Sequence, residues 1–234
     1  MSLSTRPAGN QLLALLPLAE YQRLHALMRP VDLDFRQVLY PTGAPIEHVY
    51  FLNRGTASAL TVMEDGSAIE VATIGNEGMV GLGALLADRT SPNKVIIQIA
   101  GDALRMDADV LEQEAKSDSP LRRLLLLYQT AFLTQVSYSV ACNGLHPVQQ
   151  RCCRWILMTH DRMDSDEIPL THEFLGIMLG VRRASVTEVL GPLHEKGLVN
   201  NGRGTITIVD RGGLEKLACE CYRKVKSEFD RLLK

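Results

Sequence analysis

The sequence lacks the features of a membrane-spanning or exported chain. Its longest purely apolar runs are short, such as LLLLY at Leu124–Tyr128, whereas a membrane-spanning helix needs roughly 18–20 apolar residues. The first residues, MSLSTRPAGNQ, do not follow the basic-then-apolar order of a signal peptide. We therefore expect a soluble cytoplasmic protein with no membrane partner.

Motifs of enzymes and metal sites are also missing. The sequence contains no G-x-S-x-G, phosphate-binding loop, dinucleotide fingerprint or H-E-x-x-H motif. Its six histidines are scattered, and the zinc-ribbon pair C-x-x-C does not occur. We therefore expect neither an enzyme nor a metal site.

Cysteine is scarce and confined to the second half of the chain. An odd number of thiols fits a reducing compartment better than a disulfide scaffold; the five are Cys142, Cys152, Cys153, Cys219 and Cys221. Buried structural thiols are the simplest interpretation. The alternative is a redox or metal switch that pairs Cys142 with its copy in a second chain, or Cys152 with His146. Cys219 and Cys221 lie two apart near the start of the terminal helix, so we expect them to diverge, serving packing and surface.

An excess of positive charge, typical of nucleic-acid-binding proteins, is absent overall. The formal net charge is -2 and the pI is near 6.3. Residues 1–145 carry 11 Lys+Arg and 15 Asp+Glu, a balance of -4, whereas residues 146–234 carry 14 and 12, a balance of +2. Because electrostatic attraction acts through the local field, a slightly basic module can bind DNA beside an acidic one.

The first half of the chain does contain a β pattern. An apolar helical stripe over Asn10–Met28, with a break at Pro17, precedes it. Glycines and turn residues then separate the strand-like runs QVLY, EHVYFLN, ASALTVM, AIEVATI, KVIIQIA and ALRM. This spacing favours an antiparallel roll or barrel, within which Gly81–Ala87 is expected to form one short helical turn.

A long helical region follows, over Asp109–Glu114 and then Pro120–Cys142. One apolar stripe can pack on the roll while the rest forms a seam with a second copy; an internal core helix is the alternative. The proposed dimer-helix residues are Leu121, Leu124, Leu125, Tyr128, Phe132 and Gln135. Gly144 and Pro147 mark the expected boundary between domains 1–145 and 146–234.

The second domain shows the pattern of a winged helix-turn-helix. Thr171 is a suitable N-cap for a helix that ends near Leu179. Gly180 turns the chain into a second helix over Arg183–Glu195, and VNNGRGTITIVD predicts a two-stranded hairpin. The predicted fold class is therefore α+β: an N-terminal antiparallel β-roll (jelly-roll-like) with a long dimerisation helix, then a C-terminal winged helix-turn-helix.

The start of the second helix carries the side chains expected to read DNA. An arginine fork can bond guanine O6 and N7 together, while Glu188 can accept from a cytosine amino group or pair with an arginine. Arg203 on the hairpin tip and the Thr171 hydroxyl are expected to contact phosphates. The candidate DNA-binding residues are Thr171, Arg182, Arg183, Ser185, Thr187, Glu188 and Arg203.

These motifs resemble the Crp/Fnr family of bacterial transcription regulators. VLYPTGAPIEHVYFLNRGTASAL is similar to the family's opening roll strands, and LTHEFLGIMLGVRRASVTEVLGPLHEKGLV with GTITIVD to its winged helix. The resemblance implies a homodimer that binds a double-stranded DNA operator and contacts RNA polymerase, with the roll as effector domain. A small-molecule or redox sensor whose helix-turn-helix mediates protein contacts is the alternative function.

The chain departs from the family at the effector segment GLGALLADRTSPNK. Gly81 matches the family's glycine, but Leu82 replaces the ribose-binding glutamate, and Arg89-Thr90 match the phosphate-binding pair only across a shortened loop. A ribose hydroxyl left unpaired there would lose roughly 1–3 kcal/mol, so cyclic AMP is disfavoured. An iron–sulfur cluster is disfavoured because no cysteine precedes Cys142, and so is haem ligation by a roll histidine such as His48. The effector's identity stays open.

The recognition helix departs from the family as well. Arg183 matches the first arginine of the best-known members, but Ala184 replaces their glutamate and Glu188 their second arginine. The resemblance therefore implies a different DNA half-site.

Overall fold

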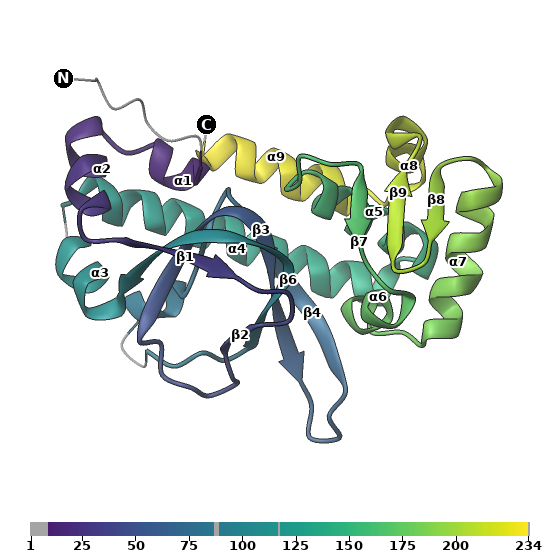
Figure 1. Ribbon diagram of the computed structural model, residues 1–234, viewed down its shortest axis with the longest axis horizontal. Helices are drawn as coiled ribbons and strands as arrows, with labels where there is room; N and C mark the ends of the chain where they lie inside the picture. Colours follow the sequence, from purple (N-terminus) through teal and green to yellow (C-terminus); the bar gives the residue numbers. More distant parts are fainter. Residues whose placement is uncertain (1–8, 87–88, 117, 234) are drawn as a thin grey trace. The chain divides into compact units, whose positions relative to one another are not determined.

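The computed structural model describes residues 9–86, 89–116 and 118–233 of the chain (Figure 1). The described residues form two compact units, one within residues 1–58, 74–131 and 229–234, and the other within residues 59–73 and 132–228. The division falls inside the long helix, whereas the sequence places the domain boundary near residue 145.

Two short helices open the first unit and confirm the break at Pro17. They are α1 (Gln11–Ala14) and α2 (Leu18–His25). The side chain of Asn10 caps α1 by accepting from the backbone N–H of Leu13, and its amide donates to the carbonyls of Leu52 and Gly78, each at 2.8 Å. This buried side chain therefore fixes α1 to the β structure.

The β structure is one six-stranded sheet in which the observed order is β1-β6-β3-β4, with β2 paired to β6 and β5 to β3 (Figure 1). Its strands are β1 (Arg29–Leu33), β2 (Val38–Tyr40), β3 (His48–Val62), β4 (Ala68–Ile74), β5 (Met79–Val80) and β6 (Lys94–Asp107). β1 and β2 pair antiparallel with β6, and β5 with β3. A 3-10 turn, η1 (Leu82–Leu85), forms inside the predicted segment, whose Ala87 lies outside the described residues.

Two glycines that the sequence pattern treats as strand boundaries lie inside long strands instead. β3 joins EHVYFLN to ASALTVM through Gly55, and β6 joins KVIIQIA to ALRM through Gly101. A Cβ on Gly101 would lie 2.1 Å from the carbonyl oxygen of Arg54, and one on Gly55 would lie 2.6 Å from that of Ile99. The prediction of separate strands was wrong here because glycine allows two backbones to approach closely without ending either strand.

The long helical region is α3 (Ala108–Glu114) followed by α4 (Pro120–Leu145). The hydroxyl of Ser119 accepts from the backbone N–H of Arg122 at 3.1 Å, and Pro120 occupies the first turn, where no N–H is needed. The Tyr128 hydroxyl donates to the carbonyl of Met79 at 3.1 Å. The helix therefore begins with strong local signals and packs one face inside the chain.

The second unit contains the end of β3, nearly all of β4, the rest of α4 and the C-terminal elements up to residue 228. Those elements are α5 (Val148–His160), β7 (Glu167–Pro169), α6 (His172–Leu179), α7 (Arg183–Glu195), β8 (Val199–Gly202), β9 (Thr205–Ile208), α8 (Arg211–Leu217) and α9 (Cys221–Leu233). The predicted two-stranded hairpin gains a third strand, because β7 pairs with β9 in the order β7-β9-β8. Hydrophobic pattern alone did not predict β7, which is only three residues long.

Buried hydrogen bonds connect β4 to α4 and α5 within this unit. Trp155, the only tryptophan, donates its indole N–H to the carboxylate of Glu70 at 3.0 Å. The Thr73 hydroxyl donates to the same carboxylate at 2.8 Å, and the Gln135 amide donates to the Thr73 carbonyl at 2.9 Å. These contacts explain why residues 59–73 group with the second unit.

No helix in the described part of the chain is both long and apolar enough to cross a bilayer.

The close approach at Gly101 predicts a large loss of stability from one methyl group. Gly101→Ala should lower the free energy of unfolding by about 2–3 kcal/mol, since the new Cβ meets backbone rather than a movable side chain. Gly191→Ala is the control: apart from its chain neighbours and the backbone of its own helix, no atom lies within 4 Å of the added Cβ in α7. Because Pro192 follows and restricts a side chain before it, the change should stay within about 1 kcal/mol of zero. Urea unfolding measures both, and equal effects would contradict the argument.

Candidate DNA-binding site

The turn between α6 and α7 depends on two glycines. The hydroxyl of Thr171 caps α6 by accepting from the backbone N–H of Phe174 at 3.1 Å, as predicted. Gly180 ends the helix in the left-handed region with φ of 63°, which favours glycine. A Cβ on Gly176 would lie 2.9 Å from the carbonyl oxygen of Val181. The turn is therefore tight because neither glycine carries a side chain.

Helix α7 separates an inner and an outer face as the sequence predicts. Val186, Leu190 and Leu193 are fully buried, and Val189 is half-buried. The outer residues of the first turns are exposed, apart from a half-buried Ser185: Arg182, Arg183, Ala184, Thr187 and Glu188. The hydrophobic side fixes the helix while the polar side remains available.

The N-terminus of α7 is suited to a negatively charged ligand. Arg182, its N-cap residue, makes no side-chain capping bond, and the first turn carries no acidic residue. The first backbone N–H groups and the positive end of the helix dipole are therefore available to a phosphate.

The charged candidates on this surface are not committed to each other. Within the described ranges, none of Arg182, Arg183, Glu188 and Arg203 makes an ion pair. Of the two alternatives for Glu188, pairing with an arginine is thus not found.

Two residues that the sequence did not single out hold the recognition helix to the wing. The ring of His172 bonds the Thr187 hydroxyl oxygen through Nδ1 at 3.0 Å and the Asn201 amide oxygen through Nε2 at 2.9 Å. The Thr187 hydroxyl also donates to the carbonyl of Arg183 at 3.2 Å. Thr187 therefore has a positioning role, and sequence spacing gave no signal for this bridge between His172 and Asn201.

The wing tip is a two-residue turn that places Arg203 in solvent. Gly202 pairs with Thr205 in the β8–β9 register, so only Arg203 and Gly204 connect the strands. Gly204 has φ of 80°, and Arg203 is exposed. Beneath the motif, the buried guanidinium of Arg151 in α5 donates to the carbonyl of Leu179 at the end of α6, and burial lowers the pKa of Arg151.

The effector segment has the glycine that the family resemblance requires, but its arginine, Arg89, forms ion pairs within the chain. Gly81 has φ of 97°, and a Cβ there would lie 2.6 Å from the hydroxyl oxygen of Tyr40. Burial raises the pKa of Tyr40 well above its usual value, and its hydroxyl donates to the carbonyl of His48. Leu82 and Thr90 are half-buried.

Carboxylates of α3 already neutralise Arg89. Its Nη2 lies 2.7 Å from the Asp109 carboxylate and 3.6 Å from that of Glu112, and its backbone has φ of 50°. The arginine that would bind a phosphate is therefore ion-paired within the protein, although its buried Nε and Nη2 make no hydrogen bond among the described residues.

Comparison with known proteins agrees with both halves of this structure. A cyclic nucleotide-binding domain matches residues 31–118, and a Crp-like helix-turn-helix domain matches residues 150–217. The chain belongs to the Crp/Fnr family. It is a DNA-binding transcription regulator of the Crp/Fnr type rather than an enzyme, and its α+β fold class is confirmed.

The relatives span most of the chain at low identity. A global nitrogen regulator from Nostoc sp. is 24% identical over 183 residues, which is 74% of this chain and 81% of its own. One from Synechocystis sp. is 25% identical over 203 residues, 81% and 90% of the two chains. The structure of FixK2 from Bradyrhizobium japonicum aligns with a TM-score of 0.71 at 19% identity, covering 82% of this chain and 98% of that one.

Helix α4 exposes a different face from the one that the sequence predicts for dimerisation. Five of the six proposed dimer-helix residues are buried within the chain, namely Leu121, Leu124, Leu125, Tyr128 and Gln135, and Phe132 is half-buried. They pack against this chain rather than facing a partner. Apart from the terminal Leu145, the exposed residues of the helix instead recur at spacings of three or four: Pro120, Arg123, Leu126, Thr130, Leu133, Ser137, Val140 and Gly144.

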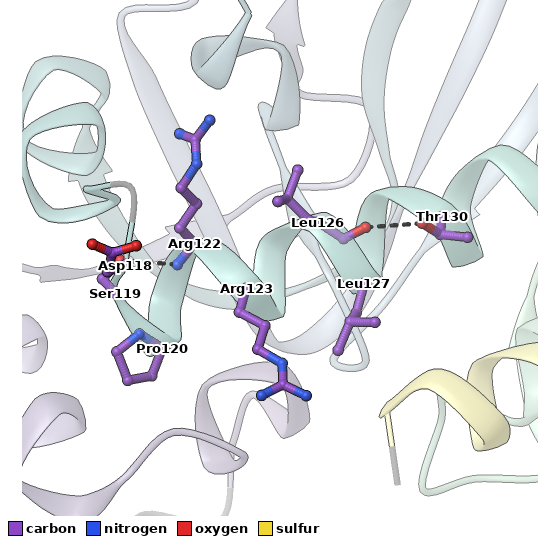
Figure 2. Close-up of a pocket in the computed structure, with 8 residues that line it drawn as sticks. All are labelled: Asp118, Ser119, Pro120, Arg122, Arg123, Leu126, Leu127 and Thr130. Atoms are coloured by element: carbon purple, nitrogen blue, oxygen red, sulfur yellow. Dashed lines mark hydrogen bonds between the residues drawn. The ribbon is translucent and has the colours of Figure 1, made fainter.

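A shallow hollow of about 570 Å³ adjoins the first part of this exposed stripe (Figure 2). It is lined by Asp118, Ser119, Pro120, Arg122, Arg123, Leu126, Leu127 and Thr130. Figure 2 shows Arg122 and Arg123 extending in opposite directions and the Thr130 hydroxyl bonded to the carbonyl of Leu126, at 3.0 Å. The hollow is therefore part of the outer surface of α4.

All five cysteines are buried, which agrees with structural thiols for Cys152 and Cys153. Burial raises the pKa of Cys153 to about 12, so its thiol is unreactive. Two other expectations were wrong: Cys221 is 2% exposed rather than on the surface, and Cys219 and Cys221 approach each other. His146 faces Cys221, with 3.6 Å between Nδ1 and Sγ, rather than Cys152.

Proposed function

We propose that this regulator binds a near-palindromic DNA site as a homodimer through α7 and the wing. The observation that carries the proposal is the exposed, unpaired arginine pair at the uncapped start of α7. The second helix of such a motif lies in the major groove, so Arg182 and Arg183 would reach base edges. Two copies would read half-sites about 34–36 Å apart.

The remaining candidates divide between bases and backbone. Glu188 is exposed and unpaired, so it is available to a cytosine amino group. Half-buried Ser185 lies beside it, while Thr187 positions the helix through His172. Arg203 at the wing tip and the free hydrogen of the Thr171 hydroxyl suit phosphate oxygens. Contact with RNA polymerase remains a prediction from the family resemblance.

Selection of binding sites from random duplexes tests these roles. The wild-type chain should select a near-palindrome with affinity that falls steeply as salt rises. Arg183→Ala should reduce discrimination at one base pair per half-site by about 1–3 kcal/mol. Arg203→Ala should instead weaken all sequences about equally and reduce the salt slope by about 1. Binding without sequence preference would favour a helix-turn-helix that contacts proteins.

The exposed stripe of α4 supports dimerisation. Leu126, Leu133 and Val140 are 49%, 63% and 66% exposed and lie seven residues apart. Between them lie Thr130 and Ser137, whose hydroxyls donate to the carbonyls four residues earlier at 3.0 and 2.9 Å. Apolar residues at every seventh position suit one of the two seam positions of a two-helix coiled coil, and the satisfied hydroxyls of Thr130 and Ser137 lower the cost of burying the other.

Leu133→Asp should separate the dimer. It places a charge in the seam without disturbing the chain's own core, so light scattering should report one chain instead of two. Operator affinity should fall about 10²-fold, because two linked half-site contacts become one. Met63→Asp is the matched control, since Met63 is 60% exposed on the hairpin between β3 and β4; it should change neither property. If the Leu133→Asp variant remained a dimer, the interface would have to lie elsewhere.

We further propose that the roll does not take cyclic AMP. Leu82 offers no acceptor for a ribose hydroxyl, and a bound phosphate would compete with Asp109 and Glu112 for Arg89. Both obstacles raise the free energy of the bound state. The match to a cyclic nucleotide-binding domain therefore supports the fold of the roll, not this ligand.

Calorimetry with cyclic AMP at millimolar concentration should give no binding heat and no change in melting temperature. Leu82→Glu restores a carboxylate acceptor and should recover weak binding, whereas Leu86→Glu, at an exposed neighbouring position, should not. Saturable binding by the wild-type chain would contradict the proposal.

A further inference from the structure

Four metal-ligating side chains converge at a buried position away from the DNA-reading surface. Cys142 and His146 lie at the end of α4, and Cys219 and Cys221 lie where α8 leads into α9. One ligand atom from each lies within 4.8 Å of all the others. The three cysteines are at most 4% exposed and pack against Tyr138.

Local geometry explains why these four side chains converge. His146 is the first residue after α4, and its backbone N–H still donates to the carbonyl of Cys142 at 3.1 Å, so the two side chains lie on the same side of the helix end. Cys221 begins α9, but Cys219 precedes that helix in non-helical backbone. The divergence expected for residues two apart in a helix does not apply, so both sulfurs reach the same point.

Two of the distances between these ligand atoms are close to those of a tetrahedral metal site. Zinc–sulfur bonds of about 2.3 Å and zinc–nitrogen bonds of about 2.0–2.1 Å place tetrahedral ligands about 3.5–3.8 Å apart. Cys221 Sγ lies 3.6 Å from His146 Nδ1, and Cys142 Sγ lies 3.4 Å from Cys219 Sγ. The remaining ligand atoms lie within 4.8 Å of one another, so shifts of up to about 1 Å would complete the site.

The second nitrogen of the histidine has the partner that metal-bound imidazoles use. His146 Nε2 lies 3.3 Å from the carboxylate of Glu220. When the proton is on Nε2, the unprotonated Nδ1 faces Cys221 and can give its lone pair to a metal ion. Glu220 lies between two cysteine ligands, so the same short segment supplies both the ligands and their support.

We propose that Cys142, His146, Cys219 and Cys221 bind one Zn²⁺ ion in each chain. Three thiolates and one imidazole suit this soft-ligand, four-coordinate ion. All four coordination positions are filled by protein, which is typical of a structural site rather than a catalytic one.

The ion would connect the two ends of the DNA-binding module. Cys142 and Cys219 are 77 residues apart, and α5 to α8 lie between them. Closing so long a loop removes conformational entropy from the unfolded chain, so bound metal should stabilise this unit.

Metal analysis of the full-length chain, purified under reducing conditions, tests the proposal. About one zinc per chain should be retained through dialysis. After the zinc is removed with a chelator, Co²⁺ should give thiolate charge-transfer and tetrahedral absorption bands that saturate at one equivalent and disappear on adding Zn²⁺. Zinc should also raise the melting temperature by at least about 5 °C.

Variants separate metal ligation from simple packing. Cys219→Ala should lose the Co²⁺ bands, while Cys152→Ala, which removes an equally buried thiol outside the cluster, should retain them. Should Cys219→Ala not fold, Glu220→Ala still tests the site, because Glu220 is 60% exposed in its side chain and ligates nothing. It should weaken Zn²⁺ affinity at least about tenfold.

Three results would overturn the proposal. The first is a wild-type chain that neither retains zinc nor gives Co²⁺ bands. The second is a Cys142–Cys219 disulfide under the same reducing conditions, seen as a loss of two hydrogens by mass spectrometry. The third is iron with sulfide in place of zinc. None of these experiments measures DNA binding, so they test the metal site independently of the proposed regulatory function.

Discussion

Helix α4 must satisfy two packing surfaces at once, and this constraint shapes the rest of the structure. Its buried face includes Leu125, which packs within the chain, and Tyr128 and Gln135, which also donate hydrogen bonds to carbonyls of the sheet. Its exposed face presents Leu126, Leu133 and Val140. A helix with apolar residues on both sides cannot remain monomeric in water without exposing one side. This exposed apolar face is the one that the proposed dimer would bury.

Helix α7 of the DNA-binding module likewise has one face that packs within the chain and one that is exposed. Val186, Leu190 and Leu193 fix one side of α7, and the glycines at the preceding turn allow α6 to approach it closely. The charges are thereby presented on a rigid element rather than a loop. Because DNA responds to the local field, Arg182 and Arg183 can act in a chain whose net charge is -2. The acidic balance belongs mostly to residues 1–145.

The winged helix could be predicted because local sequence signals set the ends of its helices. Features that depend on contacts between residues far apart in the sequence could not be predicted. Thr171 and Gly180 each set a helix end through their own chemistry, so the bounds of α6 and α7 followed from sequence. The α4 pattern predicted a helix but not its outward face, since apolar residues occur on both sides. Gly55 and Gly101 resemble turn residues until the opposing backbone is known. The cysteine–histidine cluster was missed because its two halves are 77 residues apart and share no spacing motif.

The position of that cluster connects it physically to the dimer seam. Val140 and Gly144 of the exposed stripe alternate with Cys142 and His146 along the last turns of α4. The backbone N–H of His146 donates to the carbonyl of Cys142 at 3.1 Å, so one helical turn holds both ligands. A metal ion there would order the helix end that also contributes to the proposed seam. Ordering this helix end costs conformational entropy, and that cost is paid only once. Whichever event came first, metal binding or dimerisation, would therefore make the other more favourable, even if neither changed the other's contacts.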